Sequence, residues 1–475
     1  MDVSCTKEEF IRDFSKQIQN KSASLFIGSG LSRAAGYVDW KGMLKEVAED
    51  IGLNVDKEHD LISLAEYYVN SKKNRSKIDM ALSQFFSKKI EPTETHRILA
   101  SLHITNYWTT NYDKLLEHTF EELNMTYSFL TNDQSLKKYI NGNEIIIHKL
   151  HGDVDTPNEA VITKTDYDEF AYKHEILLSK LKGEMCTNTF LFLGYSFSDT
   201  DINHILTRIK LFYKGQPARN HYCIQEIVKQ KENEPKEEFE YRKRKQDHHI
   251  LDLQNYGVHT VLVEDYNQDI PKILNEIKKR INANNVFISG ACDDTNENLN
   301  EYVDLTKNLA SWLIKKDYKI YTGYGQNIGS AIISGVYDVL QNKHYYLKKF
   351  SDQVVILPFP YKSKFSEKEK KEVYEKLRKD YISNTQIFII INGTKKYYAK
   401  QIISSGAIDE FEIANKLGCL IIPIAVTGGA AYEIWEKMKE FNTQYTNSTE
   451  FNSLIEHKDC KTILKNIDNI LKKYM

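Results

Sequence analysis

The sequence contains little cysteine and little proline, and it lacks any long apolar run. It has six cysteines and eight prolines among 475 residues, and no two cysteines show the CxxC spacing of structural zinc sites. The longest apolar stretches, such as 387–391 and 419–426, are far shorter than the roughly 18 residues of a membrane-spanning helix. The first 14 residues carry acidic side chains and no apolar segment, which argues against a signal peptide. We therefore expect a cytoplasmic protein with no metal centre, no disulfide framework and no membrane partner.

Net charge is also nearly absent. The chain carries 64 basic and 66 acidic residues, so its formal charge is −2 with neutral histidines. Such a weak field gives no electrostatic reason to expect a nucleic-acid partner. Hydrophobic residues make up 41% and charged residues 27% of the chain, as in folded globular proteins. A chain of this length predicts two or three domains.

Short apolar strands alternate with helical segments, a pattern that predicts parallel sheets covered by helices. In the first part of the chain we expect strands at 24–27, 106–110, 144–150, 189–194 and 259–263. A stretch of mixed charge at 229–247 is interpreted as a solvated helix or insertion. A second strand–helix pattern begins at residue 284, with strands expected at 286–289, 318–321, 354–357, 386–391 and 420–426. The sequence thus predicts an α/β protein with two tandem Rossmann-like domains, 1–283 and 284–475, each a mostly parallel sheet flanked by helices.

Polar and glycine residues follow four strands of the first domain. Glycine lets a ligand approach the backbone, and a helix that begins after a glycine turn offers N–H groups to a phosphate. Ligands in open parallel sheets lie beyond the carboxyl ends of the strands, so these segments are expected to meet in one crevice. The candidate residues are Gly28, Ser29, Gly30, Ser32, Asn111, Asp113, His151, Gly194 and Ser196. A tight turn without a ligand, and a capped helix start at 111–113, are the structural alternatives.

This combination resembles the sirtuin family. In that family Gly-x-Gly-x-Ser holds the NAD phosphates, Thr-x-Asn-x-Asp lines the nicotinamide ribose pocket, and His-Gly supplies the catalytic base. The segments 28–32, 109–113 and 151–152 match these motifs in order, and 194–196 resembles a later Gly-x-Ser turn near the adenine ribose. The resemblance covers roughly the first 280 residues. It implies that NAD+ is a substrate rather than a prosthetic group, that His151 is a general base and that Asn111 positions water or ribose. The other seven candidate residues would bind NAD+.

Two departures from the sirtuin pattern narrow the expected reaction. The paired CxxC motifs of the zinc module of protein-deacylating sirtuins are missing, and 36–41 reads Gly-Tyr-Val-Asp-Trp-Lys where the family has Gly-Ile-Pro-Asp-Phe-Arg. Both favour hydrolysis of NAD+ to ADP-ribose and nicotinamide. The alternatives are a sirtuin-type protein deacylase or ADP-ribosyltransferase, and a non-catalytic NAD and nucleotide-sensing scaffold. A pure binder, however, needs no base beside the anomeric carbon.

A second glycine loop, 322–329, follows a predicted strand of the second domain and opens a helix. This spacing is typical of a phosphate cradle. The candidate residues are Gly290, Gly323, Gly325, Gly329, Ser330, Arg378, Lys395 and Glu410. The two basic side chains could bind a diphosphate, and the glutamate could accept a hydrogen bond from a ribose hydroxyl. The alternative for the basic residues is that they are ordinary surface charges.

This second pattern resembles the SLOG family of nucleotide-sensing domains. Related phosphoribohydrolases carry Pro-Gly-Gly-x-Gly-Thr-x-x-Glu, and 403–410 keeps the acid but not the glycine-rich loop, which favours binding without catalysis. A sirtuin-like domain followed by a SLOG domain resembles the effectors of the Thoeris antiphage defence system over the whole chain. The resemblance implies a tetrameric NAD+ hydrolase that stays inactive until its SLOG domain binds a cyclic ADP-ribose isomer (gcADPR). A TIR-domain partner, ThsB, would make that signal, and depletion of NAD+ would stop growth of the infected cell. The same resemblance places Arg378, Lys395 and Glu410 among the signal-binding residues.

Overall fold

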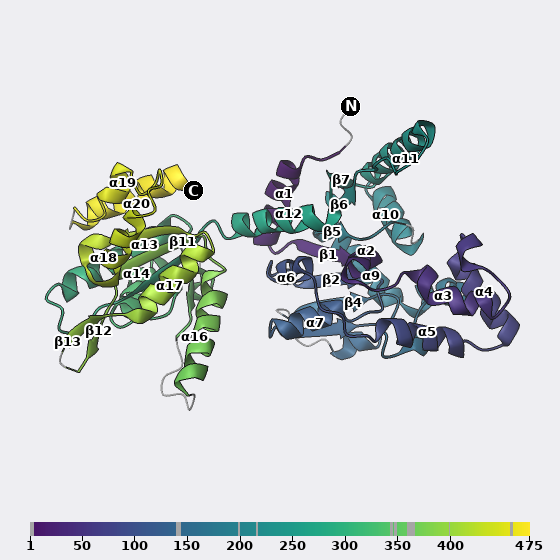
Figure 1. Ribbon diagram of the computed structural model, residues 1–475, viewed down its shortest axis with the longest axis horizontal. Coiled ribbons are helices and arrows are strands. Elements are labelled where there is room, and N and C mark those ends of the chain that lie inside the picture. Colours follow the sequence, from purple (N-terminus) through teal and green to yellow (C-terminus); the bar gives the residue numbers. More distant parts are fainter. Residues whose placement is uncertain are drawn as a thin grey trace. The chain divides into compact units, whose positions relative to one another are not determined.

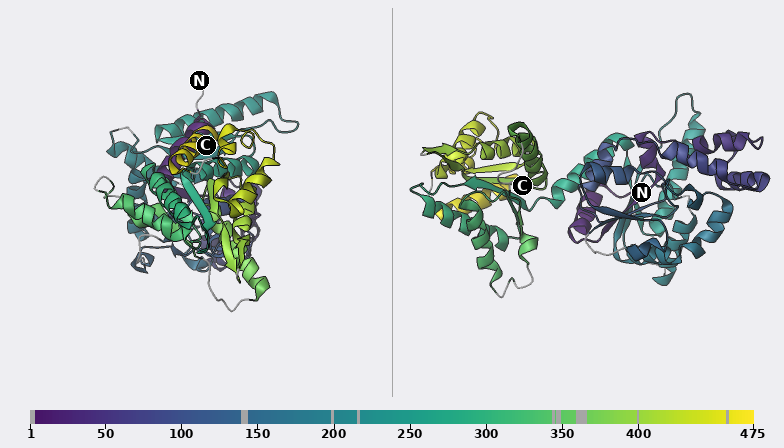
Figure 2. Two further views of the ribbon diagram at one scale, coloured as in Figure 1. Left: turned by 90° about the vertical axis from the view of Figure 1, so that its left-hand side faces the viewer. Right: turned by 90° about the horizontal axis from the view of Figure 1, so that it is seen from below.

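The computed structural model describes residues 4–138, 144–197, 200–214, 217–342, 345, 349–358, 366–398, 400–456 and 459–475. The chain forms two compact units, Met1–Ile281 and Asn282–Met475 (Figures 1 and 2). Each unit has a parallel sheet flanked by helices, so the predicted α/β class with two such sheets is confirmed. Among the described residues, no helix is long and apolar enough to cross a membrane.

The first sheet has seven strands in the order β3-β4-β2-β1-β5-β6-β7, and all of its pairings are parallel. Its strands are β1 Ala23–Ile27, β2 Asn106–Thr109, β3 Tyr127–Leu130, β4 Ile145–Lys149, β5 Thr189–Leu193, β6 His221–Glu226 and β7 Val258–Val263. From β1 the chain builds outward on one side through β2 and on the other through β5. The carboxyl end of β1 is therefore a topological switch point, where open α/β sheets bind their ligands.

Helices cover both faces of this sheet because its strands carry apolar side chains on both faces. Leu25 and Ile27 belong to the core beneath α1, α6, α7 and α12, whereas Phe26 belongs to the core beneath α9 and α10. A third cluster joins α3, α4 and α5. The helices are α1 Lys7–Gln19, α2 Ser29–Ala35, α3 Trp40–Glu49, α4 Leu61–Lys72, α5 Ser76–Phe86, α6 Glu94–Ala100, α7 Leu115–Glu122, α8 Lys164–Lys173, α9 Glu175–Thr187, α10 Thr200–Phe212, α11 Lys236–Asn255 and α12 Tyr266–Ile281. The mixed-charge stretch lies largely in α11, which buries only Ile250 and Leu253.

The second sheet has five parallel strands in the order β10-β9-β8-β11-β14. These are β8 Asn285–Ala291, β9 Lys319–Thr322, β10 Val354–Ile356, β11 Ile387–Asn392 and β14 Leu420–Ile424. Every residue of β11 is buried, as expected for a strand covered on both faces. A small antiparallel hairpin, β12 Thr394–Tyr397 and β13 Lys400–Ile403, stands apart from this sheet and was not predicted.

The helices of the second unit complete its core. They are α13 Leu299–Lys315, α14 Ile328–Leu340, α15 Phe350–Gln353, α16 Glu367–Ile382, α17 Ser405–Lys416, α18 Gly429–Lys439, α19 Thr449–Asn452 and α20 Cys460–Tyr474. Helices α13 and α14 approach closely at Gly335, where a Cβ would lie 2.1 Å from the carbonyl oxygen of Lys307. Residues along α16 and in the amino-terminal part of α17 line the pocket described below.

Candidate functional sites

A pocket of about 340 Å³ lies at the carboxyl edge of the first sheet. Seven of the nine residues predicted for this site line it: Ser29, Ser32, Asn111, Asp113, His151, Gly194 and Ser196. The segments after β1, β2, β4 and β5 therefore meet in one crevice, because parallel strands present their carboxyl ends to the same edge.

Gly28 and Gly30 pack against the end of β5 and do not line this pocket. A Cβ on Gly28 would lie 2.4 Å from the carbonyl oxygen of Gly194, and one on Gly30 would lie 2.8 Å from the Cα of Gly194. Their N–H groups donate to the carbonyl oxygens of Leu193 (2.8 Å) and Gly194 (2.9 Å). Helix α2 begins directly at Ser29, so the glycine segment is a short turn held tightly against the end of β5.

Asn111 and Asp113 share the hydroxyl group of Ser32. The Asn111 Nδ2 donates to Ser32 Oγ at 2.9 Å, and that hydroxyl donates to Asp113 Oδ2 at 2.6 Å. The other carboxylate oxygen of Asp113 accepts the N–H of Leu115 at the start of α7, at 3.0 Å. Asp113 thus supports the loop before α7, and through Ser32 it fixes the amide of Asn111 at the pocket wall.

His151 lies two residues after the end of β4 and is 4% exposed. Its ring meets those of Tyr167 and Phe170 edge to face, at centroid distances of 5.3 and 5.5 Å. Gly152 follows with a φ of +94°, a conformation that favours glycine. The His151 carbonyl accepts the N–H of Val161 at 3.0 Å, so both the ring and the backbone are held.

The helical segment α3–α5 supplies an apolar wall that sequence reasoning missed. Trp40 and Phe86 line the pocket together with Tyr112, and the Tyr112 ring lies 6.4 Å from that of Trp40 and 5.8 Å from that of Phe86. The helical spacing that begins at Trp40 predicts a helix but does not reveal which of its apolar faces turns to a ligand.

A second cavity of about 620 Å³ adjoins the first and shares Gly194, Tyr195 and Ser196 with it. Gly30 lines this cavity, as do Arg33 of α2 and Glu226 at the end of β6. The N–H of Gly194 donates to the Tyr266 hydroxyl, which pins the shared segment. Sequence reasoning missed Arg33 and Glu226 because neither belongs to a glycine motif.

The second unit has its own pocket, of about 840 Å³, at the carboxyl edge of its sheet. Six of the eight residues predicted for it are lining residues: Gly290, Gly323, Gly325, Arg378, Lys395 and Glu410. Gly329 and Ser330 are instead part of the first turn of α14. A Cβ on Gly329 would lie 2.6 Å from the Tyr324 ring, and Ser330 Oγ donates to the Asn327 carbonyl at 2.9 Å. Only the first half of the predicted cradle therefore borders this pocket.

Glu410 is a buried acid inside this pocket. Its Oε2 accepts the Ser289 hydroxyl at 2.6 Å, and its Oε1 lies 4.0 Å from Arg378 Nε. Burial raises the pKa of Glu410 to about 7, although the Ser289 hydroxyl and the Arg378 charge oppose this shift. Arg378, the single arginine after residue 280, also donates to Asp409 Oδ2 at 2.9 Å.

Positive charge gathers around the rest of this pocket. Lys370 and Lys371 of α16 line it, in addition to Arg378 and Lys395, and the first turn of α17 lines it at 404–407. Sequence reasoning missed both lysines because they sit in a charged run that is typical of an exposed helix. Cations beside a helix N-terminus suit an anionic ligand. In the described parts of the chain, no group of three or more His, Cys, Asp or Glu residues could hold a metal ion.

Both units of the chain are similar in sequence to known proteins. The model of the SIR2-like domain matches residues 105–250, and that of the Sir2- and TIR-associating SLOG family matches residues 269–474. The chain is 36% identical to the NAD(+) hydrolase ThsA of Bacillus cereus (strain MSX-D12), over 92% of this chain and 91% of that protein. It is 35% identical to the NAD(+) hydrolase ThsA of Cytobacillus dafuensis, over 91% and 88% of the two chains. A more distant relative, Defense-associated sirtuin 2 of Bacillus subtilis, is 20% identical over 43% of this chain and 21% of that protein.

Proposed function

This chain belongs to the ThsA family of NAD+ hydrolases, and from that membership we propose that its first unit cleaves NAD+ to ADP-ribose and nicotinamide as part of an antiphage defence. The observation that carries the proposal is the meeting of Asn111 and His151, from different strands, in one pocket of about 340 Å³. A base and an amide beside a shared cavity are what hydrolysis at an anomeric carbon requires.

In this proposal water attacks the ribose carbon that bears nicotinamide. The carbon–nitrogen electron pair leaves with nicotinamide, and His151 takes a proton from the water, which it then releases to solvent. Asn111, fixed through Ser32 and Asp113, orients the water or the ribose. The aromatic wall of Trp40, Phe86 and Tyr112 suits the flat nicotinamide ring and keeps bulk water out.

The adjoining cavity of about 620 Å³ suits the adenosine half of the same substrate. Its shared border at 194–196 lets one extended dinucleotide occupy both cavities. Arg33 can meet the diphosphate and Glu226 can accept a ribose hydroxyl. Gly28 and Gly30 contribute by allowing the turn before α2 to approach β5.

The test is nicotinamide release from NAD+ by the full chain, with and without gcADPR, beside a His151→Ala variant. Release by the wild type and its loss in the variant are expected. Binding of NAD+ without release under any condition would contradict hydrolysis and leave a sensing scaffold. An acceptor-dependent product would instead support the deacylase or transferase alternative.

For the second unit we propose that its pocket binds a cyclic ADP-ribose isomer made by a TIR-domain partner and thereby activates the first unit. Four cationic side chains suit the diphosphate, and Glu410 suits a ribose hydroxyl. A ligand can activate only through a higher affinity for the active state than for the resting state. We further propose that this coupling operates in a tetramer in the cytoplasm, where depletion of NAD+ arrests the infected cell.

A further inference from the structure

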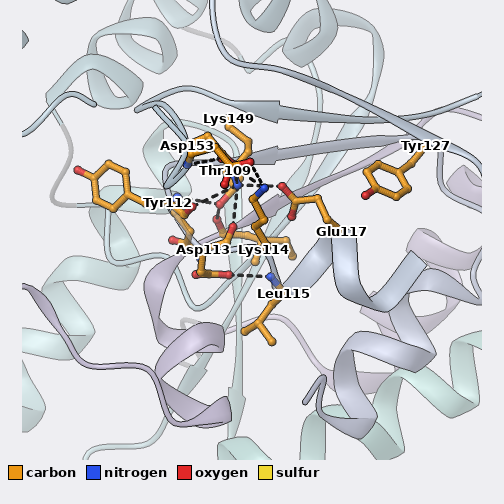
Figure 3. A network of polar contacts seen from close by, with 12 residues as sticks. Thr109, Tyr112, Asp113, Lys114, Leu115, Glu117, Tyr127, Lys149 and Asp153 are labelled. Carbon is orange, nitrogen blue, oxygen red and sulfur yellow. Dashed lines mark hydrogen bonds and ion pairs between the residues drawn. The ribbon is translucent and has the colours of Figure 1, made fainter. Parts of the chain in front are cut away.

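A buried cluster of charges lies outside both pockets. Lys149 is the last residue of β4 and is 1% exposed, and Glu117 and Asp153 are 4% and 2% exposed. The Lys149 ammonium group donates to Glu117 Oε1 at 2.9 Å and to the carboxylate of Asp153 (Figure 3). These three side chains are not among the lining residues of the 340 Å³ pocket, so a role there must act through other residues.

The same ammonium group joins the two segments that carry Asn111 and His151. It donates to the carbonyl oxygens of Tyr112 at 3.3 Å and Asp113 at 2.7 Å, directly after Asn111 (Figure 3). Its bond to Asp153 reaches the segment directly after His151 and Gly152. One side chain thereby ties the end of β2 to the end of β4, the two strands that deliver the candidate catalytic groups.

Further bonds run from this cluster to the pocket. Asp113, whose carbonyl Lys149 binds, accepts the Ser32 hydroxyl, and that hydroxyl accepts Asn111 Nδ2. A shift of the backbone at Asp113 would therefore change the position and orientation of the Asn111 amide. The Val154 N–H also donates to the Tyr112 carbonyl at 3.1 Å, which adds a second link between the two segments.

A buried ionic cluster contributes less to stability than its hydrogen bonds suggest, because its charges lose their hydration. Removal of an ammonium group and two carboxylates from water is energetically unfavourable, and well-packed apolar side chains often give equal stability. Although burial alone would lower it, the carboxylates of Glu117 and Asp153 raise the pKa of Lys149, so its charge is fixed at neutral pH. An apolar side chain could fill the volume, but it could not bind two carbonyl oxygens and two carboxylates together.

We propose that Lys149 is a positioning residue for NAD+ cleavage, which holds the Asn111 segment against the His151 segment while Glu117 and Asp153 hold its ammonium group in place. This inference rests on the proposed function of the first unit. Small misplacements of reacting groups, of about 1 Å, can cost roughly 100-fold in rate, so loss of the clamp is expected to lower kcat.

The test uses the full chain with gcADPR and compares two variants of the cluster. The Glu117→Gln/Lys149→Met variant removes one charge of each sign and leaves Asp153 with Lys114, whose Nζ lies 3.9 Å from its carboxylate. Asp153→Asn keeps the shape of the side chain and weakens its hold on Lys149. We expect kcat to fall about 30- to 100-fold in the first variant and about 5-fold in the second. The NAD+ dissociation constant, measured in a His151→Ala background, should change less than about threefold, since the clamp does not line the pocket.

Lys180→Met is the matched control. Lys180 lies against the other face of β4, with its Nζ 3.2 Å from His148 Nε2 and 5.7 Å from the centroid of the Trp108 ring. Its kcat should stay within about twofold of the wild type. Wild-type kcat in a folded cluster variant, or a loss that equals the unfolded fraction measured by circular dichroism, would overturn the inference. Absence of NAD+ cleavage by the wild type would instead overturn the proposed function, and the inference with it.

Discussion

The two units place a pocket at the same position of the same architecture, but they surround it with different chemistry. The first pocket is bordered by aromatic rings and by His151 and Asn111, and the buried Lys149 outside it is paired with Glu117 and Asp153. The second is bordered by Lys370, Lys371, Arg378 and Lys395 and contains one buried acid, Glu410. A parallel sheet thus fixes where a ligand binds, whereas the side chains at the strand ends decide whether it reacts or is only held.

The largest expected effect is on the rate of NAD+ cleavage, and it should leave binding of gcADPR unchanged. His151→Ala should lower kcat for NAD+ cleavage about 1000-fold, within the range typical for loss of a general base. Its affinity for gcADPR should remain within about twofold of the wild type, because His151 belongs to the first pocket alone. Calorimetric titration beside a nicotinamide assay measures both. Loss of gcADPR binding in a folded variant would contradict the division between the two pockets.

The pH dependence of stability should single out the second pocket. Glu410 binds a proton more tightly when folded, with a pKa of about 7, than in the unfolded chain at about 4.5. Its contribution therefore favours the folded state below pH 4.5 and is lost as the pH rises through 7. Glu410→Gln should thus be more stable than the wild type at pH 8, by at most about 3 kcal/mol, with the difference fading near pH 4.5. Urea unfolding at both pH values tests this, and an equal difference at both would refute it.

Removal of the Arg378 guanidinium should weaken binding of gcADPR in the second pocket without changing the first pocket. Arg378→Ala is expected to lower gcADPR affinity about 50- to 100-fold, because a charge-assisted contact contributes roughly 2–3 kcal/mol. Lys437→Ala is the matched control, since Lys437 pairs with Glu412 on the surface of the same unit and does not line the pocket. Calorimetric titration decides, and equal affinities in the two variants would remove Arg378 from the site.

The smallest effect concerns a feature that both units share. Gly28 lies against Gly194, and Gly325 lies against Gly290, where a Cβ would be 1.9 Å from the carbonyl oxygen. Gly28→Ala and Gly325→Ala should each lower the free energy of unfolding by about 2 kcal/mol, the usual cost of overpacking. Gly183→Ala, in α9 with open space around it, should be neutral or stabilising by up to about 1 kcal/mol. Thermal unfolding of the three variants provides the comparison, and equal stabilities would show that the close approach is not required.

The sequence was most informative where a strand end carries a glycine or a chemically distinctive residue. Strands β1, β2, β4 and β5 are almost entirely buried, and the predicted convergence of the motifs that follow them is found in the structure. The edge strand β3 is half-exposed, and β6 contains polar residues, so neither shows a clear pattern. The hairpin β12–β13 is mostly exposed and has no apolar alternation.

Residues whose role depends on tertiary contacts could not be found in this way. A lysine at the end of a strand is expected to be exposed. Lys149 is nevertheless buried, because Glu117 of α7 forms an ion pair with it. Gly329 and Ser330 fit the spacing of a phosphate cradle, but the turn at Asn327, with a φ of +63°, places them in α14. Spacing along the chain therefore locates a loop, whereas packing decides which part of it faces the ligand.

The rate of nicotinamide release as a function of gcADPR concentration, in the wild type and in Arg378→Ala, tests the central claim most directly. If recognition in the second unit gates hydrolysis in the first, the wild type is activated by gcADPR. The activation curve of the variant then shifts to about 50- to 100-fold higher concentration and reaches the same plateau. Release that does not depend on gcADPR, or identical activation curves for the two proteins, would contradict the account.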